Sequence, residues 1–575
     1  MGAILVQYII FLILLLVLGI PLGIYMGKVM SKEKVALDVV CKPLEKGVYT
    51  CLGIDQESKM TAREYMLSIG FLSFFSFIFV FALHVFQAAL PFNPQHLPGT
   101  SWDVAFNNAI SYLTNTNWQA YAGEKQLSYF TQMLGLTVQN FVSAAVGIAV
   151  LFAVIRGFTQ TKEKSLGNFW VDLIRIILYI LLPLAGVVAF ILVSQGVVQS
   201  FSPYVTATLL EPYTNSLGNL LKEQIIPLGP AASQIAIKQL GTNGGGFFGA
   251  NSAFPLENPT TISNLVEMLA ILLIPTGLCF TFGRNVKDMK QGVALFTAMF
   301  IILIIALGVV GFSEHAGTPQ LQAQGTVELL SSGNMEGKEA RLGIAGSSAW
   351  AVFTTAASNG SVNAMHDSFT PLGGMMLMLL MELGEVIFGG VGCGLYGIIG
   401  FAVLTVFIAG LMVGRTPEYL GKKIEPFEMK MAAIICLASP VVILVGSGIA
   451  TLVPSVVASI HNSGAHGLSE ILYNFSSVGG NNGSSFAGMA TNTVGMNVAL
   501  GICMLIARFA PMGAALAMAD SLSQKKQVAS TSGTLSTSNG MFVFLLIFVI
   551  LLIGALSFFP ALALGPVAEY LQMFK

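Results

Sequence analysis

The chain has 575 residues, of which 54% are hydrophobic and only 10% charged. About a quarter of the residues of a soluble domain are charged, so this composition excludes an ordinary soluble protein and predicts an integral membrane protein surrounded by lipid. The formal net charge of -1 leaves no basic face, so no nucleic-acid partner is expected. The six cysteines are scattered, which favours buried thiols over a disulfide framework or a metal site.

Ten apolar runs are long enough to cross a bilayer, which takes about 20 residues per helix. They cover residues 4–26, 67–90, 131–155, 171–194, 262–282, 293–312, 373–413, 429–453, 487–513 and 541–564. A cleaved signal peptide would need a basic start, which the first run lacks, so we interpret it as an anchored helix. The chain is therefore predicted to be an all-α integral membrane protein with about ten transmembrane helices.

Lysine and arginine predict the orientation, because positive charge is retained on the cytoplasmic side of short loops. Nineteen of the 27 lysines and arginines fall in alternate loops on one side, among them Lys28, Arg156, Lys287, Arg415 and Lys525. These loops are assigned to the cytoplasm, so the N-terminus is predicted to lie outside.

Four polar stretches then fall on the outer side, each between two apolar runs: residues 114–121, 241–259, 355–367 and 475–488. A short helix-compatible run precedes each one, at residues 103–113, 231–240, 347–354 and 468–473. Irregular backbone at membrane depth is tolerated only where it lines a water-filled cavity. The pattern predicts four helix–pore-loop–helix repeats that form a pseudo-fourfold, channel-like pore.

The composition of these stretches suits a cation filter made of backbone carbonyls, which replace the hydration shell without fixed negative charge. Glycine permits the required dihedrals, and Asn, Thr and Ser supply further oxygens or brace the loop. Because no carboxylate lies among the filter positions, a monovalent cation is favoured over a divalent one. For any one stretch alone an ordinary glycine-rich external loop is the favoured interpretation, but four stretches at matching positions favour the filter. The candidate filter residues are Thr114, Asn115, Thr116, Thr242, Asn243, Gly244, Ser358, Asn359, Gly360, Asn481, Asn482 and Gly483.

Four motifs carry a family resemblance: TNTNWQ around Asn115, the run GTNGGGFF followed by NP, the His366–Asp367 pair, and NNGS from Asn481. Over nearly its whole length the chain resembles the potassium-binding A subunit of the bacterial Kdp-type potassium-transporting ATPase. The resemblance implies the fold of the superfamily of potassium transporters, with K+ bound at the filter. It also implies that Asn115 replaces the central glycine of the first filter and that Gln119 supports K+ binding. Asn359 departs from the family pattern, in which cysteine is frequent at this place.

The source of energy is not in this chain. It has no phosphate-cradling GxxxxGK[ST] loop, no DKTG phosphorylation site and no long soluble segment, so no nucleotide is expected to bind and ATP hydrolysis by this chain alone is excluded. The resemblance implies a P-type ATPase subunit (KdpB-like) as partner, reached through an intramembrane tunnel, and small accessory membrane subunits (KdpC-like and KdpF-like) in the bacterial inner membrane. The chain would then be the non-catalytic, potassium-selecting subunit of a high-affinity uptake system.

Run 373–413 is far longer than one span and is rich in glycine, which weakens a helix by roughly 1 kcal/mol per residue. A break is therefore predicted there, with Glu382 and Glu385 sharing one helix face beside it. Carboxylates inside a membrane are functional candidates, although two acids hydrogen-bonded for packing are the alternative. The resemblance implies a gating loop beneath the filter and places Glu385 at the tunnel entrance. Arg508 is interpreted either as snorkelling from the inner end of the ninth span or as guiding K+ and coupling to the ATPase.

These elements predict six regions: residues 1–66 with the first helix and a cytoplasmic loop, four pore repeats at 67–170, 171–291, 292–428 and 429–520, and residues 521–575 with the last helix. The alternative function is a stand-alone channel or secondary transporter for K+ or Na+, since four filters serve both. A membrane enzyme using His366 and Asp367 lacks a nucleophile arrangement, so a bracing role of this pair is favoured.

Overall fold

The computed structural model describes residues 2–215, 218–319, 333–412, 414, 416–528 and 535–574. Residue 413, the end of the seventh predicted run, and Arg415, counted above among the cytoplasmic cations, lie outside these ranges. Within them, ten helical segments are long and apolar enough to cross a membrane, which confirms the predicted number. They are Ile4–Met30, Ala62–Ala89, Thr131–Thr159, Phe169–Ser194, Thr261–Asn285, Met289–Ala316, Cys393–Met412, Pro426–Ala450, Val494–Gln524 and Gly540–Gln572.

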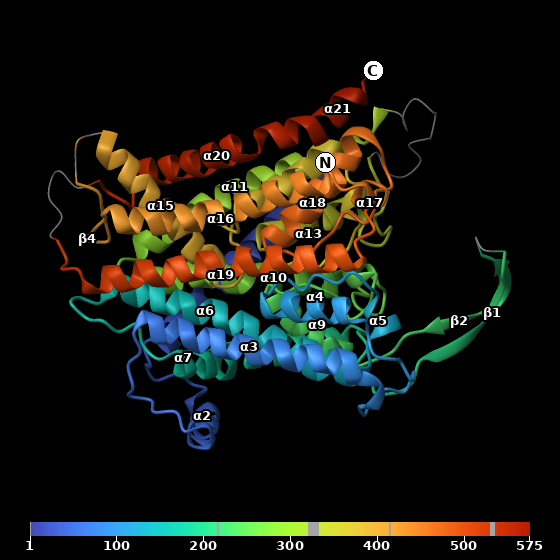
Figure 1. Cartoon of the computed structure of the whole chain (residues 1–575), viewed down its shortest axis with the longest axis horizontal. Coiled ribbons are helices and arrows are strands. Elements are labelled where there is room, and N and C mark those ends of the chain that lie inside the picture. Colours follow the sequence, from blue (N-terminus) through green and yellow to red (C-terminus); the bar gives the residue numbers. More distant parts are fainter. Residues whose placement is uncertain are drawn as a thin grey trace.

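The long helices run side by side, and four short helices lie among them toward one end of the bundle (Figure 1). The long ones are α1 Gly2–Met30, α3 Ala62–Phe86, α6 Val138–Thr159, α10 Thr261–Asn285, α11 Met289–Ala316, α15 Cys393–Met412, α16 Pro426–Ala450, α19 Val494–Gln524 and α20 Gly540–Leu562. A further span consists of α7 Phe169–Ile176, the π-helix η3 Ile177–Leu181 and α8 Leu182–Ser194, and π-helix η2 Thr131–Thr137 leads into α6. The four short helices are α4 Trp102–Leu113, α9 Ala231–Leu240, α13 Gly343–Ala356 and α18 Gly464–Gly479.

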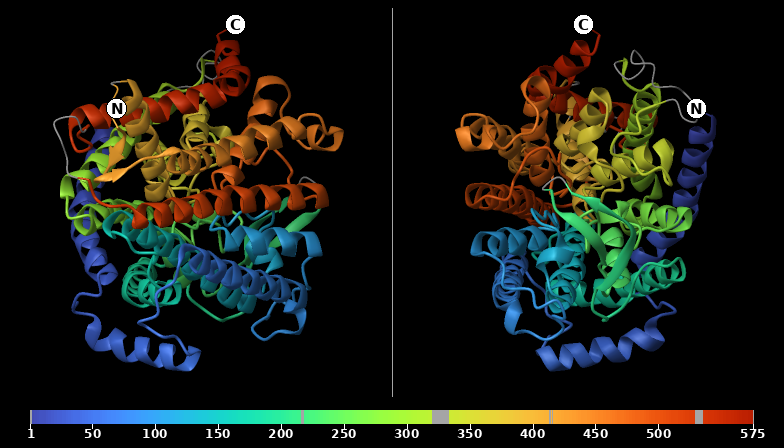
Figure 2. Two further views of the ribbon diagram at one scale, coloured as in Figure 1. Left: turned by 60° about the vertical axis from the view of Figure 1, so that its left-hand side comes forward. Right: turned by 90° about the vertical axis from the view of Figure 1, so that its right-hand side faces the viewer.

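The remaining elements are short. They are α2 Asp38–Leu52, η1 Gln87–Ala89, α5 Gly123–Gln126, η4 Asn251–Ala253, η5 His366–Ser368, α14 Pro371–Glu382, α17 Pro454–Val457, η6 Ala563–Val567 and α21 Ala568–Gln572. The β-strands in the described residues form two antiparallel hairpins. One pairs β1 Val205–Thr214 with β2 Leu220–Ile226, and the other pairs β3 Glu418–Tyr419 with β4 Lys422–Lys423. The β1–β2 hairpin projects from the end of the molecule near which both termini lie, whereas α2 lies across the side of the bundle (Figures 1 and 2).

Local sequence signals fix where several spans begin. Thr61 accepts a hydrogen bond from the Glu64 amide while the Glu64 carboxylate accepts from the Thr61 amide, which is a capping box at the start of α3. Thr493 caps α19 by accepting from the Met496 amide. Because the first amides of a helix have no partner inside it, such caps stop the apolar spans at defined residues.

Packing follows the small residues. On α1, a Cβ added at Gly23 would lie closer than 3.0 Å to the Gly277 carbonyl of α10. Because the two helices approach so closely here, Thr281 Oγ1 of α10 donates a hydrogen bond to the Gly23 carbonyl at 2.9 Å. Close backbone contact of this kind is the main way membrane helices associate, since lipid tails are as apolar as leucine. On the other side of such helices large apolar side chains are exposed, for example Phe190 at 77% and Leu556 at 75%, as expected of a lipid-facing surface.

Two predictions about the spans differ from the structure. The predicted ninth run, 487–513, is shifted: residues 487–493 form the irregular return from the fourth polar stretch, and α19 continues to Gln524 because Ala514, Ala515 and Ala519 extend it as a buried helix. The predicted seventh run is broken, as expected, into α14 and α15 with a non-helical segment, 383–392, between them. Glu382 is the last residue of α14, so the expectation that Glu382 and Glu385 share one helix face is wrong.

Candidate ion-binding site

The four polar stretches adopt one backbone conformation. In each of them the second residue after the short helix has a positive φ, at Asn115 (65°), Thr242 (46°), Ser358 (48°) and Asn481 (46°). The fourth residue has a positive φ again, at Asn117 (53°), Gly244 (67°), Gly360 (93°) and Gly483 (105°). Left-handed residues that alternate with ordinary ones allow successive carbonyls to face the same side, which neither a helix nor a strand does.

One hydrogen bond fixes the register of the stretches. The amide of the third residue donates to the carbonyl of the residue five positions earlier in the short helix: Thr116 to Ser111 (2.9 Å), Asn243 to Lys238 (2.9 Å), Asn359 to Thr354 (2.9 Å) and Asn482 to Ser477 (2.8 Å). Residues 114–117, 241–244, 357–360 and 480–483 are therefore equivalent. The residue in register with the three glycines is Asn117 and not Asn115, so the sequence-based assignment of Asn115 to the glycine position is wrong by two residues.

The stretches close into a ring. The Asn115 side chain donates to the Thr242 carbonyl at 2.9 Å, which joins the first stretch to the second. At the next three junctions, a glycine of one stretch packs on a backbone carbonyl of another so closely that an added Cβ would lie within 3.0 Å: Gly244 on Asn359, Gly360 on Asn482, and Gly483 on Thr116. The contacts run from first to second, second to third, third to fourth and fourth back to first, so four stretches of one chain surround one axis.

Side chains of the third residues form hydrogen bonds that connect neighbouring units. Asn482 Nδ2 donates to the Thr354 carbonyl at 2.7 Å, and Asn359 Nδ2 donates to the Lys238 carbonyl at 3.1 Å. Each amide thus reaches the end of the preceding short helix. Because these side-chain amides are occupied, the backbone carbonyls are the groups of the ring best placed to meet an ion.

A cavity of about 330 Å³ opens above the ring, and we call it the vestibule. Its lining includes the ring residues Asn117, Gly360 and Gly483, together with Gln119 and His366. Asn117 is 1% exposed, and neither atom of its side-chain amide has a hydrogen-bond partner in the protein. Gln119 Oε1 accepts from the Gly246 amide at 2.7 Å, so this side chain braces the second stretch from the first.

Segment 383–392 lies against the opposite side of the ring. The Val391 amide donates to Thr242 Oγ1 at 2.9 Å, and the Gly389 amide donates to the Ala356 carbonyl, the last of α13, at 2.9 Å. Glu382 Oε1 accepts from Ser476 Oγ of α18 at 3.1 Å. Segment 383–392 and the end of α14 are therefore hydrogen-bonded to three of the four units.

Arg508 lies near the middle of α19 and is 4% exposed, so it does not snorkel to an interface. Its Nη1 is 3.7 Å from Glu385 Oε2, and this ion pair joins the segment 383–392 to the ninth span. Glu385 itself has a φ of 58°, a left-handed conformation that the surrounding contacts must hold. A buried guanidinium needs a counter-charge, and here the carboxylate of the break supplies it.

Two features of the site were missed by sequence reasoning. Asn117 was missed because the end of a helix cannot be read to a single residue. Lys238 of α9 was not identified as a site residue, but it is 1% exposed and lies behind the second stretch in an ion pair with Glu257. The signal for it was present, since a lysine within an otherwise apolar and amide-rich short helix is unusual.

His366 and Asp367 brace the outer loops. His366 Nδ1 is 2.6 Å from the Tyr473 hydroxyl of α18, and Asp367 accepts from the Gly488 amide at 2.6 Å. Asp367 also lies 3.0 Å from His466 Nε2, whose other ring nitrogen is 2.9 Å from Glu569. Burial alone would lower the pKa of His466, but hydrogen bonds to the two carboxylates outweigh it and raise this pKa to about 10.

Ten candidate spans among the described residues, together with a ring of four equivalent stretches, define a multi-pass membrane protein with a channel-like core. The chain matches the family model described as potassium-transporting ATPase A subunit over residues 9–571. It belongs to this family.

Curated relatives cover the whole length of the chain. The potassium-transporting ATPase potassium-binding subunit of Clostridium botulinum (strain Eklund 17B / Type B) is 63% identical over 577 residues, covering 100% of both chains. The proteins of the same name from Clostridium perfringens (strain ATCC 13124) and Listeria monocytogenes serotype 4a are 63% and 58% identical, again over 100% of both chains. Among solved structures, the potassium transporter TrkH from Vibrio parahaemolyticus has a TM-score of 0.47 at 13% identity, covering 76% of this chain and 83% of that chain, and no argument rests on it.

The family is that of the A subunit of a potassium-transporting ATPase, as the sequence predicted, and the curated relatives are named potassium-binding subunits.

Proposed function

We propose that the ring binds K+ from the outer solution through backbone carbonyls and that this chain is the potassium-selecting subunit of an ATP-driven uptake system. The observation that carries the proposal is the closed ring, in which four stretches share one backbone conformation and contact one another in cyclic order. The ion-binding residues would be Thr114, Asn115, Thr116, Thr242, Asn243, Gly244, Ser358, Asn359, Gly360, Asn481, Asn482 and Gly483, with Gln119 as support and Asn117 added at the outer rim.

Below the ring, we propose that segment 383–392 gates the exit of the ion. Its hydrogen bonds to Thr242 and Ala356 give it direct contact with the ring, and the Glu385–Arg508 pair connects it to α19. Glu385 and Glu382 would mark the entrance of an intramembrane tunnel, through which K+ passes to a P-type ATPase subunit. Small accessory membrane subunits would complete the complex.

The four pore repeats proposed from the sequence, residues 67–170, 171–291, 292–428 and 429–520, each contain one short helix and one ring stretch. With the N-terminus outside a bacterial inner membrane, the vestibule faces the outer solution and the lysine-rich loops face the cytoplasm. Both termini and the four short helices lie toward the same end of the bundle, which supports this assignment (Figure 1).

Two measurements test the proposal. The first is competition among K+, Rb+ and Na+ for uptake by cells that carry the complex. We expect Rb+ and K+ to compete and Na+ to fail, and equal competition by Na+ would contradict potassium selection.

The second measurement is purification in mild detergent, where we expect an ATPase subunit to accompany the chain. Recovery of the chain alone, with K+ flux that needs no ATP, would support the stand-alone channel instead.

A further inference from the structure

Lys238 stands at a position where the other three short helices carry a hydroxyl side chain. The equivalent residues, which offer the carbonyl that fixes each stretch, are Ser111, Thr354 and Ser477. Their hydroxyls bond within their own stretch: Ser111 donates to the Trp118 carbonyl, Thr354 accepts from the Gly360 amide, and Ser477 accepts from the Gly483 amide. A hydroxyl is therefore sufficient in three units, and only the second unit has an ammonium at this position, where its removal from water is costly.

The Lys238 ammonium is directed at the fifth residue of the second stretch. Its Nζ donates to the Gly245 carbonyl at 2.9 Å, and Asn251 Nδ2 donates to the same carbonyl at 2.6 Å. In two other units the fifth carbonyl is also bound by a side chain of the short helix: Trp118 by Ser111 at 3.0 Å, and Ser361 by Trp350 Nε1 at 2.8 Å. In these three units the bonds hold the fifth carbonyl toward the short helix, so the row of carbonyls available to an ion ends there with the fourth residue.

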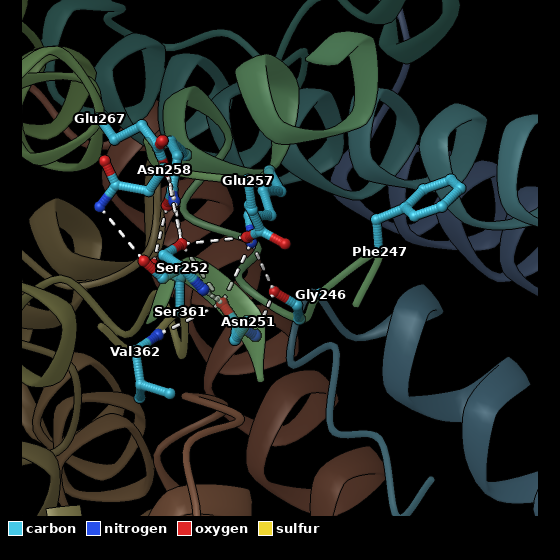
Figure 3. Close-up of polar contacts among 12 residues, drawn as sticks. Gly246, Phe247, Asn251, Ser252, Glu257, Asn258, Glu267, Ser361 and Val362 are labelled. Atoms are coloured by element: carbon cyan, nitrogen blue, oxygen red, sulfur yellow. Dashed lines mark hydrogen bonds and ion pairs between the residues drawn. The ribbon is translucent and has the colours of Figure 1, made fainter. Parts of the chain in front are cut away.

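The ammonium is itself held in place. Glu257, 0% exposed, forms a close ion pair with Lys238, and Asn251 Oδ1 accepts from the ammonium at 3.1 Å. Figure 3 shows the side chains of Glu257, Asn251 and Ser252 close together, with a hydrogen bond from Ser252 to Glu257. Three acceptors surround the three protons of the ammonium, so its direction toward Gly245 is determined by the site rather than by the flexible lysine stem.

The same network reaches the third stretch. Gln239 Nε2 donates to Glu267 Oε2 at 2.9 Å, while Gln239 Oε1 accepts from Ser361 Oγ at 2.8 Å. The Val362 amide donates to Asn251 Oδ1 at 3.3 Å, and this bond is drawn in Figure 3. A displacement of Lys238 would therefore disturb two adjacent stretches of the ring and the vestibule above them.

We propose that Lys238, held by Glu257, is a positioning residue that keeps the Gly245 carbonyl out of the ring and thereby sets the affinity and selectivity of the site for K+. This inference rests on the proposed function, because it assigns a role at the same ring. A residue that only stabilises the fold would behave differently, since its effect would disappear once the buried charges are removed together.

The decisive variant is the double substitution Lys238→Met/Glu257→Gln in the complete transport complex. It removes both charges of the ion pair together, so neither Lys238 nor Glu257 leaves its partner charged and unpaired, but the Gly245 carbonyl loses its ammonium donor. We expect the melting temperature to stay within about 5 °C of the wild type, which is the shift of a small stability change. The KM for K+, measured by K+-stimulated ATP hydrolysis, is expected to rise by about tenfold with little change in kcat, and the preference for K+ over Rb+ to fall.

A folded double variant whose KM for K+ and ion preference equal those of the wild type overturns the proposal. If this double variant does not fold, Lys238→Leu/Glu257→Gln decides, because it also removes both charges of the pair and the ammonium that donates to Gly245. A raised KM in this variant supports the proposal, and an unchanged KM overturns it.

Two controls separate the outcomes. Lys222→Met removes an exposed cation of β2 and should leave the KM unchanged. Gly244→Ser alters the ring itself, so it must raise the KM if the ring binds K+ at all. An effect of Gly244→Ser without an effect at Lys238 refutes only this inference, whereas no effect at Gly244 refutes the proposed function.

Discussion

Gly483 tests whether the ring is closed, because it forms the contact that joins the fourth stretch back to the first. Its φ is 105°, and a Cβ added there would lie within 3.0 Å of the Thr116 carbonyl. Gly483→Ala therefore has two costs, a backbone conformation that L residues avoid and a collision with a rigid backbone oxygen. The collision is relieved if the Thr116 carbonyl moves away from its place in the ring.

The expected loss of K+ affinity in Gly483→Ala can be estimated from the backbone strain. A residue forced into such a conformation costs about 1–3 kcal/mol. Without K+, the Thr116 carbonyl can move away and relieve the strain. With K+ bound, the carbonyl must return to its place in the ring, so the strain lowers the binding free energy. Because 1.4 kcal/mol corresponds to a factor of ten, the affinity for K+ is expected to fall by about 5- to 150-fold. We expect the KM for K+ to rise within this range while the complex still assembles.

The assay is K+-stimulated ATP hydrolysis by the purified complex across K+ concentrations. Gly464→Ala is the matched control, because Gly464 also has a positive φ of 72° but nothing lies within 4 Å of its added Cβ. It should lower stability slightly and leave the KM alone. A KM for Gly483→Ala equal to that of Gly464→Ala would refute the closed ring as the K+ site.

Three further predictions concern single features of the site. Asn117→Gly gives the first stretch the glycine of the other three but removes an unpartnered amide from the vestibule, and the KM for K+ should rise by about 2- to 10-fold, the worth of one polar contact. Glu385→Gln leaves Arg508 buried without its counter-charge, so the melting temperature should fall, and Glu385→Gln/Arg508→Gln should regain it without regaining the transport rate. Because the folded-state pKa of His466 is raised to about 10, its stabilisation is complete below pH 6.5 and is lost as the pH rises toward 10. The difference in melting temperature between wild type and His466→Gln should therefore be large at pH 6 and small at pH 10, and a constant difference would contradict a charged His466.

The spans and the short helices were predictable because their signals are local. Residues 231–240 were predicted as a helix and α9 covers Ala231–Leu240, since the run lacks glycine and proline and a glycine-rich segment ends it. The break between α14 and α15 followed equally from glycine content. In these cases the residues that decide the structure are neighbours in the sequence.

The missed features depend on partners that are distant in the sequence. Arg508 is buried because Glu385, more than a hundred residues earlier, supplies its counter-charge. Its position in α19 was misjudged because hydropathy marks the apolar run and not the helix, which starts later and ends beyond it. The buried Lys238 needs Glu257 and the fold of the loop between them, which no periodic pattern reveals.

A ring made from one chain has a freedom that a ring of four identical subunits lacks. In a symmetric tetramer, a buried lysine behind the filter would place four ammonium groups around the cation path, and their summed repulsion would oppose cation binding. Here only the second unit has an ammonium at this position of the short helix, and it is paired with Glu257. The helix that follows the ring stretch is likewise interrupted in the third unit alone, by segment 383–392 between α14 and α15, whereas α6, α10 and α19 have no such break. Because one helix alone is interrupted, the surroundings of the ring on its inner side differ in one direction, toward segment 383–392. Under the proposed function we therefore expect the ion to leave the ring off the axis, toward the interrupted helix, which is the direction that delivery to a neighbouring subunit requires and that conduction straight through the membrane would not.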